Sequence, residues 1–152
     1  MNVQTSVTRY CLMGALIVFM VGSVACPTPD PPVLLQPTPA SPAATGTVEI
    51  DQDRNNNQIV TVQDDHLAPP QSINSEATTY VLWIHPIGTN DYINSGRLQI
   101  DNDRSAEIVV TTPFTDFEVF VTAETDAAVL HPSNSVVLHS VVADRVPVDN
   151  GD

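Results

Sequence analysis

Short runs of β-branched and apolar residues, separated by polar turn residues, make up the chain from residue 47 onward. Apolar and polar positions alternate in most of these runs, which is the pattern of strands with one buried face. The run at residues 78–85 is apolar on both faces and predicts a central strand. The other predicted strands are 47–51, 58–63, 96–100, 107–111, 117–123 and 136–142. This spacing, without a helical period, predicts an all-β fold, an Ig-like antiparallel β-sandwich of about seven strands.

The same alternation predicts which side chains form the core. In the strand at 78–85, Tyr80, Leu82 and Ile84 share one face, whereas Val81 and Trp83 share the other. Aromatic residues in so apolar a strand are expected to be buried. In the other strands, the predicted core residues are Val60, Val62, Leu98, Ile100, Ile108, Val110, Val119, Val121, Val136, Leu138 and Val142.

A proline-rich stretch precedes the predicted strands. Residues 26–46 hold more than half of the 13 prolines in the chain. Proline fixes φ and lacks a backbone donor, so we expect this stretch to enter neither a helix nor the interior of a sheet. It predicts a disordered polyproline II linker before a β-sandwich domain at residues 47–143. Residues 144–152 predict a disordered acidic tail.

The first residues have the parts of an export signal. Residues 1–9 are polar and carry one positive charge, at Arg9, and residues 11–25 are apolar and end in small side chains. A helix of about 15 residues rises roughly 22 Å, which is less than the ~30 Å thickness of a bilayer core. Residues 1–25 therefore predict a signal peptide, with cleavage after Ala25.

The end of this segment, Ser23-Val24-Ala25-Cys26, resembles the lipobox of bacterial lipoproteins. The resemblance implies acylation of Cys26, which would become the first residue of the mature chain. Acyl chains contribute about 0.8 kcal/mol per buried methylene, and two or more of them give stable membrane attachment. We therefore predict a membrane-anchored lipoprotein on the periplasmic or surface face of a bacterial cell envelope. Two alternatives stay open: secretion after ordinary signal-peptidase cleavage, because Ser23 and Ala25 are both small, and an uncleaved short anchor.

Charge and cysteine usage exclude some chemistry. The formal net charge is -13, and the chain has five arginines and no lysine. Such a surface repels phosphate groups, so we expect no nucleic-acid binding. The two cysteines, Cys11 and Cys26, both precede the predicted domain. The domain is therefore expected to have no disulfide, no thiol nucleophile and no thiolate metal ligand.

Two acidic turns, at residues 51–57 and 101–103, are candidates for calcium binding. The first has oxygen ligands at alternate positions, as calcium loops do, but it lacks the glycine and the bidentate glutamate of an EF-hand. Asn56 and Val62 stand at those two positions. The remaining prediction is a looser site shared between the two turns, and the alternative is that polar turn residues face water. The candidate ligands are Asp51, Asp53, Asn55, Asp101 and Asp103.

No pattern typical of an enzyme or a cofactor site is found. The four histidines have neither His-x-His nor His-Glu-x-x-His spacing, and the chain has no Gly-x-Ser-x-Gly elbow or P-loop. We therefore expect no catalysis and no cofactor. A secreted hydrolase that uses scattered His and Asp residues is an alternative.

A resemblance to a known family covers residues 78–139. The strings Tyr80-Val-Leu-Trp-Ile84, Gly96-Arg-Leu98, Phe120-Val-Thr-Ala-Glu124 and His131-Pro-Ser-Asn-Ser-Val-Val-Leu138 follow one another along the chain. Together they resemble the extracytoplasmic domain of RskA-type anti-sigma factors. The resemblance implies an envelope-side β-domain. Ten residues precede the apolar segment, so we expect no cytoplasmic sigma-binding domain and no sequestration of a sigma factor.

These observations predict an envelope lipoprotein whose domain is a non-catalytic binding, sensing or structural module, with an envelope protein as its partner. The alternatives are a calcium-dependent adhesion or surface-interaction module and the hydrolase.

Overall fold

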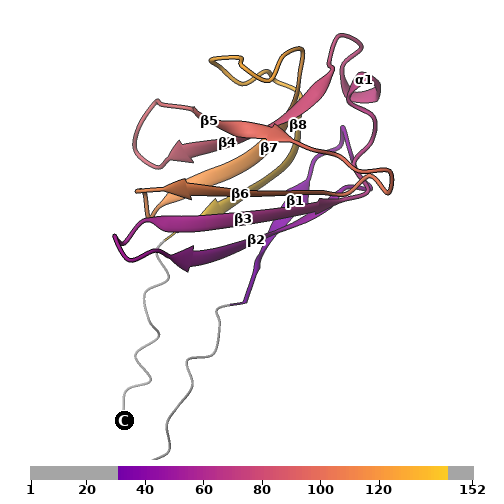
Figure 1. Cartoon of the computed structure of the whole chain (residues 1–152). Coiled ribbons are helices and arrows are strands. Elements are labelled where there is room, and N and C mark those ends of the chain that lie inside the picture. The colour runs from indigo at the N-terminus through magenta and orange to yellow at the C-terminus, as the bar shows by residue number, and fades with distance from the viewer. Residues whose placement is uncertain (1–30, 144–152) are drawn as a thin grey trace, which may run out of the picture.

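The computed structural model describes residues 31–143 (Figure 1). The predicted signal peptide, Cys26 and the predicted tail at 144–152 lie outside these residues. The described part contains eight strands and one short helix. In chain order they are β1 (Val33–Pro37), β2 (Thr45–Gln52), β3 (Gln58–Asp65), α1 (Pro70–Ile73), β4 (Thr79–Pro86), β5 (Ile93–Leu98), β6 (Ala106–Thr112), β7 (Phe117–Glu124) and β8 (Val136–Val142).

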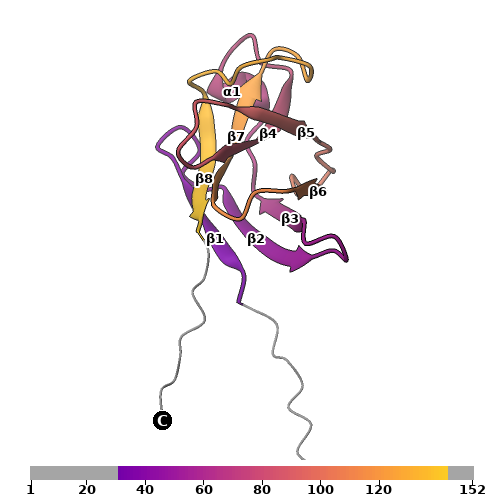
Figure 2. The same ribbon diagram turned by 90° about the vertical axis from the view of Figure 1, so that its left-hand side faces the viewer.

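The strands form one antiparallel sheet, which folds over into two layers (Figure 2). The strand order is β5-β4-β7-β8-β1-β2-β3-β6. β5, β4, β7 and β8 make one layer, and β2, β3 and β6 make most of the other. The prediction of an all-β sandwich is confirmed, with eight strands in place of about seven.

β1 joins the two layers. Val33, Leu34 and Leu35 pair with β2, whereas Gln36 and Pro37 pair with β8. The side chain of Leu35 is 3% exposed and belongs to the core. The predicted linker at 26–46 and the domain start at residue 47 are therefore wrong for residues 33–46. The reason is local, because a proline-free apolar segment can bury a leucine, and Pro37 ends the strand, where a missing donor costs little.

The core lies between the layers and largely follows the predicted alternation. Tyr80, Leu82 and Ile84 of β4 are buried in it. Of the other predicted core residues, Val60, Val62, Leu98, Val119, Val121, Leu138 and Val142 are buried, and Ile108 and Val110 pack against them partly exposed. Two predictions are wrong: Ile100 follows the end of β5 and is 36% exposed, and Val136 packs on the outer face of its layer.

β4 is buried on both faces, as predicted. Val81 and Trp83 form a second, smaller cluster with Phe120 on the outer side of the layer. Val129 and Val136 pack against this cluster and cover it. A sheet face that bears its own apolar cluster is the setting of the candidate site. Within residues 31–143, no helix has the length and apolar character needed to cross a membrane.

Candidate binding site on the outer face of β4, β5 and β7

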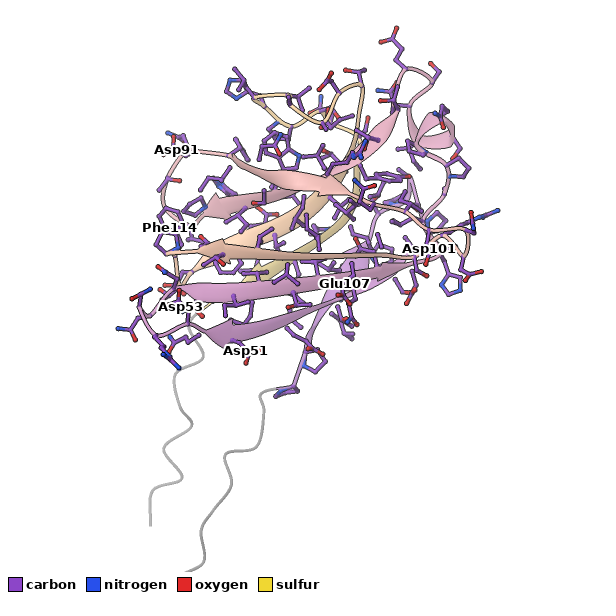
Figure 3. All side chains as sticks on the ribbon, in the orientation of Figure 1. Asp51, Asp53, Asp91, Asp101, Glu107 and Phe114 are labelled. Atoms are coloured by element: carbon purple, nitrogen blue, oxygen red, sulfur yellow. The ribbon has the colours of Figure 1, made fainter. Side chains whose placement is uncertain are left out.

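The two acidic turns that were predicted to share calcium lie at opposite ends of β3. The first turn joins β2 to β3 and holds Asp53. The second joins β5 to β6 and holds Asp101, and β6 pairs with β3 so that Ala106 is opposite Asp64. The length of β3, at about 3.3 Å per residue, separates the turns by more than 20 Å. Figure 3 shows Asp53 and Asp101 at the two ends of the layer, so a calcium ion shared between the turns is excluded.

The carboxylates of these turns instead close the turns themselves. Oδ1 of Asp53 accepts hydrogen bonds from the backbone N–H groups of Asn55 (2.7 Å) and Asn57 (2.9 Å), and Oδ2 accepts one from Nδ2 of Asn57 (2.9 Å). The pKa of Asp53 is lowered, mainly by the hydrogen bonds from Asn57. In the second turn, Oδ1 of Asp101 accepts from the backbone N–H groups of Asp103 and Ser105, both at 2.9 Å.

Asp51, the remaining candidate, is exposed in β2. Among residues 31–143, no three His, Cys, Asp or Glu side chains gather in a way that would hold a metal ion. The acidic turns thus serve the fold through the turn chemistry of aspartate.

A different set of residues meets on the outer face of the layer formed by β5, β4, β7 and β8. The pairing of β4 with β7 places Phe120 opposite Trp83 and Glu118 opposite His85. Tyr92 immediately precedes β5, and its ring stacks on His85, with ring centroids 4.6 Å apart. The Tyr92 ring also meets Phe120 edge to face at 6.0 Å. Two polar positions and three aromatic rings therefore lie side by side across neighbouring strands.

The β7–β8 loop, residues 125–135, is held onto this face by hydrogen bonds. Nδ2 of Asn94 in β5 donates to the carbonyl oxygens of Ala127 and Val129, each at 2.9 Å. Figure 1 shows this loop above the layer. Because the loop is tied to β5 as well as to the strands that it connects, it forms a fixed wall beside the aromatic rings.

A buried chain of hydrogen bonds fixes the far side of the same loop. Nε1 of Trp83 donates to Oγ1 of Thr122 (2.9 Å), and this hydroxyl donates to Oε1 of Glu124 (2.5 Å). The same carboxylate oxygen accepts from the backbone N–H of Ser133 (2.7 Å), whose hydroxyl donates to the carbonyl oxygen of Ala123 (3.1 Å). No buried polar side-chain atom of this chain of hydrogen bonds lacks a hydrogen-bond partner, which makes the arrangement rigid.

Between the loop and the strands lies a hollow of about 410 Å³, which we call the aromatic hollow. Its volume falls within the range of small-ligand sites. Tyr92 and Phe120 form its aromatic side, and Glu118 is its one carboxylate. The complete lining is Tyr92, Glu118, Phe120, His131, Pro132, Ser133, Asn134 and Val136.

A second hollow, of about 370 Å³, lies at the C-terminal end of β3, beside the second acidic turn. Asp64 and Asp65 are among its lining residues. The Asp64 side chain is 1% exposed, and neither of its carboxylate oxygens has a hydrogen-bond partner. Burial, with a further contribution from the neighbouring charge of Asp65, raises the pKa of Asp64 to about 7. Gly46 lies opposite in β2, where any side chain would overlap the carboxylate and Leu35.

The four histidines lie apart, as their sequence spacing indicates. His66 follows β3, and His139 is exposed on β8. Of the four, only His131 lines the aromatic hollow, and the ring of His85 stacks on the ring of Tyr92. The sequence did not reveal this hollow, since its residues come from three separate segments of the chain. The one signal was Tyr92, an aromatic residue among turn-forming residues outside the predicted strands.

Comparisons with known proteins add no identity. No protein-family model matches the chain, and no curated protein matches it. The resemblances to the lipobox and to the extracytoplasmic domain of RskA-type anti-sigma factors remain predictions from the sequence.

Proposed function

We propose that this protein is a lipoprotein of the bacterial cell envelope, anchored through Cys26, whose β-sandwich binds a partner at the aromatic hollow. The observation that carries the binding function is the hollow itself. It combines exposed aromatic surface, at Tyr92, with a carboxylate, at Glu118, on walls that hydrogen bonds hold in place. Preformed concave sites with aromatic walls and a few polar groups are typical of ligand binding.

The placement of the β7–β8 loop supports a tethered module. In Figures 1 and 2, this loop lies on the far side of the domain from the two ends of the described chain. A chain attached to a membrane ahead of residue 31 would then present this loop, which forms one wall of the hollow, away from the bilayer. The calcium-dependent alternative has no such support, because its ligands do not meet.

Photo-cross-linking in cells tests the binding function. The full chain carries p-benzoylphenylalanine in place of Tyr92 at the hollow, or in place of Val109, which is 56% exposed on the outer face of the other layer. We expect a discrete adduct from position 92 and none from position 109. Equal adducts from both positions, or none from position 92, would refute the hollow as the binding site.

The anchor is tested separately. Cys26→Ser removes the acylated sulfur, so we expect the protein to leave the membrane fraction and to lose incorporation of labelled palmitate. Unchanged membrane association of this variant would contradict the lipoprotein assignment without bearing on the hollow.

A further inference from the structure

We propose that the aromatic hollow binds a cationic side chain, an ammonium or guanidinium group displayed by an envelope partner, with Glu118 as its counter-ion and Tyr92 as its aromatic surface. This inference rests on the proposed binding function and names the chemistry of the ligand.

Glu118 supplies the unsatisfied charge. It is partly buried in β7 and lines the hollow. Within residues 31–143, its side chain has neither a hydrogen bond nor an ion pair with another residue. A carboxylate accepts several hydrogen bonds, and in a partly desolvated place a charged donor is its most favourable partner. An ammonium brings three donors, and a guanidinium brings five.

The aromatic rings supply a second contact for the same cation. Tyr92 is 44% exposed, and its ring is fixed by stacking on His85 and by its edge contact with Phe120. Tyr92 and Glu118 flank His85 on neighbouring strands, which places their Cα atoms roughly 10 Å apart. Both side chains line the same hollow, so a cation held there can contact the carboxylate and lie within ~6 Å of the ring, the range of cation–π attraction.

Ser133, one of the other polar residues of the hollow, offers no free donor to a neutral hydrogen-bonding ligand. The hydroxyl and the backbone N–H of Ser133 already donate to β7, so neither is free to orient a sugar or an amide. The whole chain has a formal net charge of -13 and contains no lysine. Such a charge attracts cationic partners and speeds their encounter with the domain.

The experiment uses the full chain in detergent micelles, labelled with 3-fluorotyrosine. The chain has three tyrosines, so the fluorine spectrum is simple, and Tyr92→Phe assigns the resonance of Tyr92. Tyr80 is fully buried, with its hydroxyl bonded to the carbonyl of Ala68 (2.8 Å), and its resonance is the internal control. The probes are Nα-acetyl-lysine amide and Nα-acetyl-arginine amide, with the uncharged Nα-acetyl-norleucine amide as the matched control.

We expect the cationic probes to shift the Tyr92 resonance saturably, in the millimolar range, while the norleucine probe does not. Glu118→Gln should weaken binding by about fivefold or more, whereas Glu107→Gln, on the outer face of the other layer, should leave it unchanged. Equal binding of the lysine and norleucine probes, no saturable shift, or equal losses in the two variants would overturn the inference. If the adduct from position 92 still forms in cells in that case, the binding function stands and only the ligand chemistry fails.

Discussion

Replacing Asp64 by asparagine should stabilise the protein at neutral and alkaline pH. Asp64 is buried beside Gly46 and Leu35, without a donor for either carboxylate oxygen. Its pKa in the folded protein is about 7, against 3.8 for an unperturbed group. The difference of about 3 pKa units, at 1.36 kcal/mol per unit, corresponds to roughly 4 kcal/mol.

The direction in which pH changes the free energy of unfolding depends on which state binds the proton of Asp64 more tightly. The folded protein holds the proton of Asp64 more tightly than the unfolded chain does. Below about pH 4 the group is protonated in both states and carries no penalty. As the pH rises from about 4 to about 7, the unfolded chain ionises first, and the free energy of unfolding falls. Above about pH 7 the whole penalty is present.

Urea unfolding at about pH 4 and at about pH 8 measures this effect. Asparagine has nearly the same shape and stays neutral, so Asp64→Asn should raise the free energy of unfolding by about 2–4 kcal/mol at pH 8 and change it little at pH 4. Asp103→Asn, in an exposed turn, is the control and should change it by less than about 0.5 kcal/mol at either pH. A variant that is no more stable than the wild type at pH 8, or equally shifted at both pH values, would refute this reasoning.

Three further substitutions and one control substitution test the packing, each by urea unfolding. Gly46→Ala should cost about 1–3 kcal/mol, because its Cβ would overlap the side chains opposite it, and an unchanged midpoint would contradict that overlap. Thr122→Val should lower the free energy of unfolding by about 1–3 kcal/mol and alter the fluorescence emission of Trp83, because the indole N–H loses its acceptor. Unaltered emission would argue against the buried chain of hydrogen bonds. Leu35→Ala should lower the free energy of unfolding by about 2–5 kcal/mol. Leu34 is 63% exposed, so Leu34→Ala should change the free energy of unfolding very little. Equal small effects of the two substitutions would show that β1 is not part of the folded domain.

The sequence predicts most of the fold because most strands alternate apolar and polar residues. The strand at 136–142 is predicted with its observed bounds, and β4 is correctly predicted as buried on both faces. β1 is not predicted from the sequence, because the surrounding prolines dominate the composition of its segment. Its four residues before Pro37 contain no proline, and this local feature decides that the segment pairs.

The candidate site could not be predicted in the same way. Tyr92, Glu118 and His131 are distant in sequence, and only the strand order and the path of the β7–β8 loop bring them together. The acidic turns, in contrast, have a strong local pattern, but the pairing of β3 with β6 separates them. Local pattern identifies turns and strands, whereas a site built between strands depends on their register.

The central claim is that a partner binds at the aromatic hollow. The yield of photo-cross-linked adducts in living cells tests this claim most directly. The account predicts that a cross-linker at residue 92 captures a partner and that one at residue 109 does not. Capture from residue 109 with equal yield, or a residue 92 that captures nothing, would contradict it.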